Sequence, residues 1–153
     1  MQHFIPSQNM VLHSGVPLVK IFKLQKRIVR IITKSSYRVS CRKLFRTLNI
    51  LTVPCIYIYE ILGMARGQQY SVNSDVHKYS TRNRGNLHII RHRTQMYAKS
   101  VLHRNITLYN KLPICIRNIK SDKIFMKTVH KLLIEGSYYC VEEFLADDLK
   151  YVR

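Results

Sequence analysis

The sequence predicts a mainly α-helical protein, a small helical assembly with a long basic loop in its middle. Two observations predict this class: apolar residues recur at helical spacing in several stretches, and capping residues flank those stretches. The chain has 153 residues, of which 46% are hydrophobic, so one small core can form and wholesale disorder is disfavoured. We expect one domain, made of a loose leader (1–17), a basic helical segment (18–66), a mobile basic loop (67–98) and a C-terminal helical segment (99–150).

The best-defined element is a helix from Leu18 to Thr33, with Pro17 suited to its first turn. At about 100° per residue, apolar and cationic residues separate onto two faces of this helix. We expect the apolar face to pack on the core if the chain binds nucleic acid, and its members are Ile21, Leu24, Ile28, Ile31 and Ile32. Five cations form the other face, at Lys20, Lys23, Arg27, Arg30 and Lys34.

Two more helices are predicted before residue 67. Ser40 can cap a short helix that runs through Arg46 and is closed by Asn49, with Leu44, Phe45 and Leu48 turned inward. Thr52 and Pro54 can open a third helix, over 55–66, that Gly67 ends. The run IYIYEIL inside it is also typical of a strand, but the caps favour a helix.

The second half of the chain begins with a change of composition. Residues 67–97 are rich in Gly, Asn, Ser, Arg and His and show no apolar period, which predicts a long loop. From Ser100 to Leu112 apolar residues resume, and a short helix and an extended stretch fit them equally well.

Two helices are predicted near the C-terminus. Ser121 or Asp122 can cap the first, Gly136 can stop it, and its inward positions are Phe125, Val129, Leu132 and Leu133. The second is a short helix from Val141 to Asp148, with Glu142 and Glu143 in its first turn, where the helix dipole favours negative charge.

Charge is the main functional signal. The 26 Lys and Arg outnumber 8 Asp and Glu, which gives a formal charge of +18, and no acid precedes Glu60. Most acids lie near the C-terminus, so the two ends of the chain can pair with each other. These acids cannot neutralise all the cations, and a positive surplus of this size indicates a polyanionic partner. Nucleic acid is a more common partner of this kind than anionic lipid.

The candidate binding residues fall into two groups. We expect the cations of the first two helices to bind backbone phosphates. These are Lys20, Lys23, Arg27, Arg30, Lys34, Arg42 and Lys43. A second, mobile clamp is expected at Arg82, Arg84, Arg91 and Arg93. Tyrosines lie beside several cations (Tyr37, Tyr79, Tyr97 and Tyr109), and stacking of exposed bases on such rings is the usual mode of single-strand binding. For Tyr57, Tyr59 and Tyr109 a place in the core is the better interpretation.

Enzymatic and metal sites are not expected. Asp147 and Asp148 follow Leu145-Ala146 in a helical context, and we interpret them as a solvated helix end rather than a pair that binds catalytic metal. His77, His88, His92 and His103 lack the spacing of a zinc site, and no nucleophile or phosphate-loop motif is present. The four cysteines are expected to be free thiols, mostly buried. We expect no cofactor, no small-molecule substrate, no transmembrane segment, no secretion signal and an intracellular place, cytoplasmic or nuclear.

Six segments in order resemble the C-terminal tail of the reverse transcriptase (RNA-directed DNA polymerase) of insect non-LTR retrotransposons of the jockey type. They are KLQKRIVRIIT (23–33), LF with LNILTVPCIYIYE (44–60), HKYSTRN (77–83), RHRT (91–94), LYNKLP (108–113) and FMKTVHKLLIEGSYYCVEEFL (125–145). The resemblance covers residues 19–148. Residues 1–18 do not match, and a tryptophan-containing stretch common in the family is missing.

The resemblance implies the function that we expect. In that family an endonuclease and the polymerase palm precede basic helices, and this chain resembles only those helices. It would be a catalytically incomplete fragment, with no polymerase palm, that binds RNA or DNA backbones without sequence choice. The alternatives are an amphipathic module that binds anionic membranes or a partner protein, and a decayed mobile-element product without function.

Overall fold

The computed structural model describes residues 16–79, 81–91, 93–94 and 100–149. Within these residues it contains α-helices and no strand, so the mainly α prediction is confirmed. The helices are α2 (Val16–Ile32), α3 (Cys41–Thr47), α4 (Val53–Arg66), α5 (Asn73–Val76), α7 (Val101–Lys111), α8 (Ile114–Arg117), α9 (Asp122–Gly136) and α10 (Val141–Ala146). Of the expected leader, 1–15 lie outside the described residues, and positions 16 and 17 already belong to α2.

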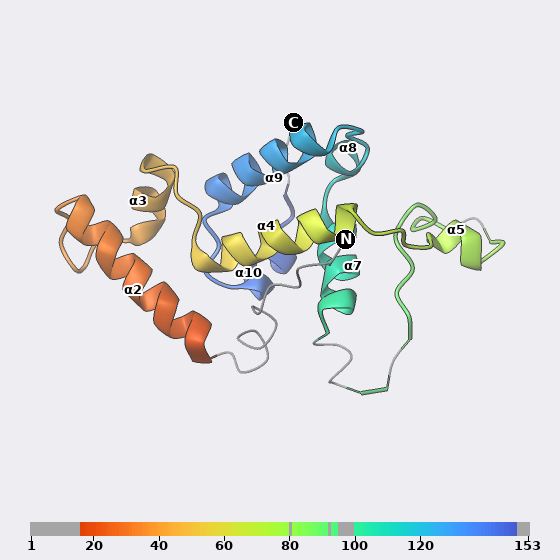
Figure 1. The fold of residues 1–153 in the computed structure, drawn as a ribbon, viewed down its shortest axis with the longest axis horizontal. Helices are drawn as coiled ribbons and strands as arrows, with labels where there is room; N and C mark the ends of the chain where they lie inside the picture. The colour runs from red at the N-terminus through yellow and green to blue at the C-terminus, as the bar shows by residue number, and fades with distance from the viewer. Residues whose placement is uncertain (1–15, 80, 92, 95–99, 150–153) are drawn as a thin grey trace, which may run out of the picture.

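The described part of the chain is elongated (Figure 1). Helix α4 lies in the middle and packs against α7 and α9, while α2 and α3 form one end and α5 lies at the other. We call α2 and α3 the end lobe, and α4 with α7 to α10 the body.

One large cluster of buried side chains holds the body together. Its centre is formed by α4, α7, α9 and α10, which contribute Ile58, Leu62, Leu108, Leu133 and Phe144, all at most 1% exposed. The four positions predicted to face inward on α9 are all buried, as expected. Tyr57, Tyr59 and Tyr109 pack against this cluster, which confirms their interpretation as core residues.

Helix α4 begins as its capping residues predict. Thr52 is the N-cap, and its hydroxyl accepts a hydrogen bond from the Cys55 N–H (3.3 Å) and donates one to the Tyr138 carbonyl (2.6 Å). The strand alternative for IYIYEIL is therefore wrong, because this run lies within α4.

The end of α9 corrects the role of its glycine. Ser137, with φ 46°, takes the left-handed conformation that closes the helix. Gly136 is needed for another reason: a Cβ there would lie 2.2 Å from the ring of Tyr138.

The end lobe has a small cluster of its own. Phe22 and Val29 of α2 pack with Cys41 and Phe45 of α3, and Tyr139 closes the cluster with its ring edge-on to Phe22, centroids 5.0 Å apart. The Gln25 side chain fixes how α2 is rotated, since it donates to the Leu51 carbonyl (2.8 Å) and accepts from the Val53 N–H (2.9 Å).

This rotation overturns the expectation for the apolar face of α2. Ile21, Leu24, Ile28, Ile31 and Ile32 are all exposed, between 46% and 68%. Helix α2 carries apolar residues over nearly half its circumference, and only the part that includes Phe22 and Val29 meets the core. The polar Gln25 lies within that buried part, so periodicity alone points to the wrong side.

The middle of the chain holds more structure than the expected loop. Besides α5, it contains one antiparallel bridge, between Val72 and Leu87. The Asn110 side chain of α7 bonds both the N–H and the carbonyl of Leu87, each at 2.8 Å, and Arg117 donates to the Asn86 side chain at 2.8 Å. These bonds fasten the segment to the body. Of the stretch from Ser100 to Leu112, for which the sequence favours neither a helix nor an extended conformation, residues Val101–Lys111 form α7 and the two end residues are its caps.

Candidate nucleic-acid interface

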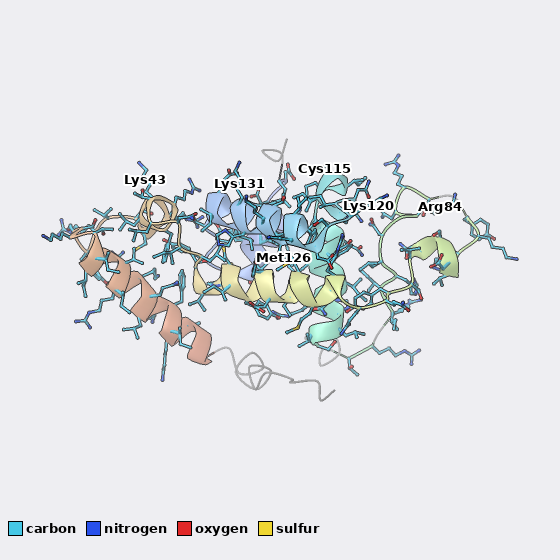
Figure 2. All side chains as sticks on the ribbon, turned by 45° about the horizontal axis from the view of Figure 1, so that its top comes forward. Lys43, Arg84, Cys115, Lys120, Met126 and Lys131 are labelled. Carbon is cyan, nitrogen blue, oxygen red and sulfur yellow. The ribbon has the colours of Figure 1, made fainter. Side chains whose placement is uncertain are left out.

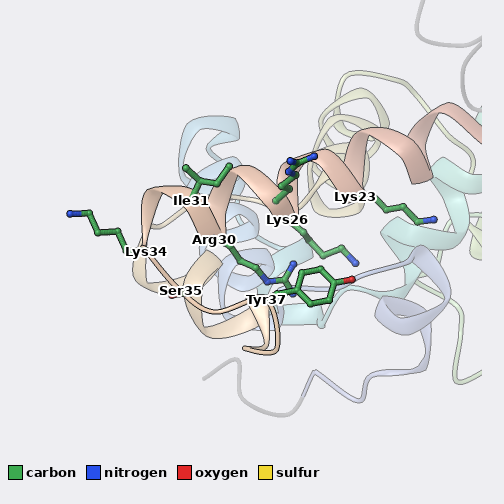
Figure 3. A pocket seen from close by; sticks show the side chains of 8 residues that line it. Lys23, Lys26, Arg30, Ile31, Lys34, Ser35 and Tyr37 are labelled. Atoms are coloured by element: carbon green, nitrogen blue, oxygen red, sulfur yellow. The ribbon is translucent and has the colours of Figure 1, made fainter.

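The cationic face of α2 presents side chains to solvent. Lys20, Lys23, Arg27 and Lys34 are exposed, and α2 contains no acidic residue. The C-terminal half of this face forms one wall of a groove of about 880 Å³, lined by Lys23, Lys26, Arg27, Arg30, Ile31, Lys34, Ser35 and Tyr37 (Figure 3). We call it the Tyr37 groove.

A sharp reversal at the end of α2 builds the other wall. Lys34 takes the left-handed conformation (φ 50°), its N–H bonds the Ile31 carbonyl, and the Ser35 N–H bonds the Arg30 carbonyl. These two bonds form the motif that commonly closes a helix. They turn the chain back so that Tyr37 lies beside Arg30 (Figure 3).

Arg30 is already occupied within this groove. Its guanidinium donates to the Val39 carbonyl (3.2 Å) and lies 5.3 Å from the centre of the Tyr37 ring. Arg30 therefore holds the loop that carries Tyr37. It adds charge to the groove but is less free to follow a phosphate than the exposed Lys23 and Arg27.

Arg42 is committed to a structural ion pair. Its guanidinium lies 2.6 Å from Glu143 and 4.4 Å from the centre of the Tyr139 ring. The hydrogen bond to Glu143 raises the pKa of Arg42. Burial opposes ionisation of Glu143, but its hydrogen bonds with Arg42 and the Tyr139 N–H outweigh that, and its pKa is lowered. The oppositely charged ends of the chain do pair here, and we leave Arg42 out of the interface.

The remaining predicted cations lie in two places. Lys43 is exposed on α3, in the end lobe (Figure 2). Arg82, Arg84, Arg91 and Arg93 are also exposed, but Arg84 lies beside α5 at the far end of the molecule (Figure 2). The structure therefore does not bring the two predicted groups together around one site.

A row of lysines on α9 was not predicted. Lys123, Lys127 and Lys131 are exposed at i, i+4 and i+8, which places them on one side of the helix. Lys43 and Lys131 project on the same side of the molecule (Figure 2). The spacing of four is visible in the sequence, whereas the prediction for this helix concerns its inward positions.

The other tyrosines near cations divide clearly. Tyr37 and Tyr79 are 85% and 82% exposed, whereas Tyr109 packs against the body's core. Tyr97 lies outside the described residues. Only the exposed rings are open to a base, and of these two Tyr37 lines a cationic groove.

The described acidic and histidine residues weighed as catalytic or metal-binding candidates have partners within the fold. Asp147 accepts a hydrogen bond from the Tyr138 hydroxyl at 2.6 Å. His77 and His88 lie edge to face, centroids 5.6 Å apart, and His92 is not among the described residues. Within the described ranges, no three His, Cys, Asp or Glu side chains gather as metal ligands would.

Two further properties were expected from the sequence. Cys41 and Cys55 are buried, and burial raises the pKa of the Cys55 thiol. Cys115 and Cys140 are exposed, so the expectation that the thiols are mostly buried holds for only half of them. Among the described residues, none of the helices combines the length and apolar character needed to cross a bilayer.

Comparison with known proteins gives no relative. No protein-family model matches the chain, and neither curated proteins nor solved structures yield a match. Function therefore has to be inferred from the surface described above.

Proposed function

We propose that this chain binds the sugar-phosphate backbone of RNA or DNA, without sequence choice, through the cationic face of α2. The observation that carries the proposal is the Tyr37 groove, where cations of one helix gather with no carboxylate in the lining. Such a surface releases counterions from a polyanion when it binds, which gives affinity that depends on salt. Lys20 on α2 and Lys43 on α3 are further exposed cations of the end lobe, and Arg82, Arg84, Arg91 and Arg93 of the middle segment form a separate second contact.

We further propose that the chain is the tail of a non-LTR retrotransposon reverse transcriptase and has no polymerase activity of its own. The order of the six similar segments supports this parentage, and the hydrogen bond from Tyr138 to Asp147 supports a structural role for Asp147. In an intact parent, the α2 surface would hold template and primer near the catalytic domain.

Fluorescence anisotropy against salt tests the binding. The double variant Lys23→Glu/Arg27→Glu removes two exposed cations without touching the bonds of Arg30. We expect the slope of log K against log salt to shrink by about 1.5, because each lost phosphate contact removes about 0.7 to 0.9.

The lysine row of α9 supplies the matched control for that measurement. Lys127→Glu/Lys131→Glu changes the net charge by the same amount on α9, outside the Tyr37 groove, and we expect a smaller change in slope. If the slope falls equally in the two double variants, net charge alone sets the affinity, and the proposal that α2 forms the interface is wrong. A wild-type protein that binds no oligonucleotide in dilute buffer would remove the function altogether.

One observation favours a second candidate function, binding to anionic membrane surfaces. The exposed apolar face of α2 lies next to its cationic face, and a helix with both faces free can lie in the headgroup region of a bilayer. We expected this apolar face to pack on the core if nucleic acid is the ligand, but it is exposed, so binding of nucleic acid leaves its exposure unexplained.

Co-sedimentation with vesicles of phosphatidylserine and phosphatidylcholine separates the two functions. Lipid binding that survives excess RNA, and that Leu24→Gln/Ile28→Gln abolishes while RNA affinity stays unchanged, would favour the membrane. Loss of lipid binding on addition of RNA would favour nucleic acid as the ligand of the cationic face.

A further inference from the structure

The ring of Tyr37 has the surroundings of a base-stacking site. It is 85% exposed, although the loop that carries it is held by the hydrogen bond from Arg30 to the Val39 carbonyl. Arg30 lies against the ring, and most of the remaining ring surface faces the groove or the solvent. Because the loop is held in place, the ring loses little conformational freedom when a flat group stacks on it. The exposed ring contributes little to the core, and its free surface is a platform on which a base can stack.

Further cations line the groove that contains this ring. Lys23, Lys26, Arg27 and Lys34 line the same groove as Tyr37. A nucleic acid that contacts both the ring and these side chains must carry an unpaired base next to phosphates. In a duplex the bases are stacked on each other, and only phosphates would reach the groove.

A second groove continues the path along α2. It has a volume of about 360 Å³, and Lys23 and Lys26 line it as well as the Tyr37 groove. Its lining also contains Tyr57, Tyr139 and Arg104, whose guanidinium lies 6.0 Å from the centre of the Tyr57 ring, and one carboxylate, Glu142. The two grooves together form a path of cations and aromatic rings with the two shared lysines at its middle.

We propose that the chain prefers single-stranded nucleic acid, with one base stacked on Tyr37 and the neighbouring phosphates on Lys23, Arg27 and Lys34. This inference rests on the proposed function and adds the class of ligand to it. Stacking on one aromatic ring tolerates every base, so the preference is for strandedness and not for sequence.

Anisotropy titrations with oligo(dT), oligo(U) and a duplex of equal phosphate number test the preference. We expect Tyr37→Ala to weaken binding of both single strands about 5- to 150-fold, to leave the duplex within about twofold, and Tyr37→Phe to restore single-strand affinity. Tyr79→Ala is the matched control, since Tyr79 is equally exposed but lies outside the groove. It should weaken single-strand binding less than Tyr37→Ala does, and an equal loss would overturn the assignment of stacking to the groove.

A direct probe of stacking is available because the chain contains no tryptophan. In a Tyr37→Trp variant the single indole reports only on this position, and its fluorescence should be quenched by oligo(dT) but not by the duplex. The corresponding Tyr79→Trp variant, whose indole lies outside the groove, should show weaker quenching.

The outcomes separate this inference from the proposed function. Wild-type protein that binds oligonucleotides while Tyr37→Ala keeps its full single-strand affinity would overturn the stacking site and leave the function standing. The same holds if Tyr37→Ala weakens single strands and duplex equally, because the side chain would then act through the loop. Wild-type protein that binds none of the three probes would overturn both.

Discussion

The body and the end lobe differ in how completely they cover their apolar side chains. Fourteen buried residues from the body form one cluster, whereas four form the cluster of the end lobe. The end lobe also leaves the apolar face of α2 in solvent. The stability of the chain therefore resides in the body, and the end lobe is the part free to present charge and apolar surface to a partner.

The end lobe is attached to the body by a few identifiable contacts. Gln25 bonds the chain just before α4, Tyr139 packs on Phe22, and Arg42 pairs with Glu143. Each contact joins residues far apart in the sequence. Variants that remove one of them should affect α2 and α3 more than the body, and variants in the body should affect the whole chain.

The largest effect is expected from Leu133→Ala in the body's core. Leu133 is fully buried, and truncation of a buried leucine costs about 2–5 kcal/mol because it leaves a cavity. The free energy of unfolding from urea titration, followed by circular dichroism, should fall by that amount. A loss below about 1 kcal/mol would mean that this cluster does not carry the stability of the chain.

A smaller and local effect is expected from Gln25→Ala. It leaves the Val53 N–H and the Leu51 carbonyl without their partner, and an unsatisfied, partly buried group costs about 1–3 kcal/mol. Hydrogen exchange followed by mass spectrometry should show faster exchange in α2 and α3 and little change in α4 and α9. Lys23→Ala on the same helix is the control, and uniform acceleration across the chain would contradict a separate end lobe.

The helices could be predicted because their signals are local. Thr52 caps α4 through a residue three positions away, and Asn49, with φ 54°, closes α3 in the conformation expected of it. Ser40 and Ser121 occupy the predicted N-cap positions, although neither side chain makes the capping bond. Periodicity and caps were sufficient to place these elements within a few residues.

The rotation of α2 and the partners of its neighbours could not be predicted in the same way. From the sequence alone, the polar Gln25 is expected to face solvent, because its hydrogen-bond partners at positions 51 and 53 come from another part of the chain. From the sequence alone, Arg42 is expected to be a free cation, because its partner Glu143 lies about a hundred positions further along the chain. The groove at Tyr37 depends on a reversal at Lys34, a residue type that seldom takes a positive φ.

The ion pair between Arg42 and Glu143 gives a pH-dependent tie between the two regions. The folded pKa of Glu143 lies below its ordinary value of 4.5, so the unfolded chain binds the proton first as the pH falls. The contribution of the ion pair to the free energy of unfolding is therefore present above pH 4.5 and is lost as the pH falls through the folded pKa of Glu143. Both side chains are about a third exposed, so we expect the ion pair to add only about 0.2–1 kcal/mol to the free energy of unfolding.

Urea unfolding of Glu143→Gln at several pH values measures this contribution. The variant should be slightly less stable than wild type at neutral pH and should approach it in acid. Asp75→Asn is the control, because this carboxyl lies in the middle segment, away from the end lobe. A constant difference between Glu143→Gln and wild type across the whole pH range would contradict the assignment.

The smallest effect is expected from Ile28→Gln on the apolar face of α2. Ile28 is 46% exposed and lies outside the end-lobe cluster, so the free energy of unfolding should stay within about 0.5 kcal/mol of wild type. Val29→Ala, one position along, removes side chain from a residue that is 2% exposed, and it should cost clearly more. If Ile28→Gln proved the more damaging of the two, α2 would have to turn its isoleucines toward the body, and both its cationic face and the Tyr37 groove would move with them.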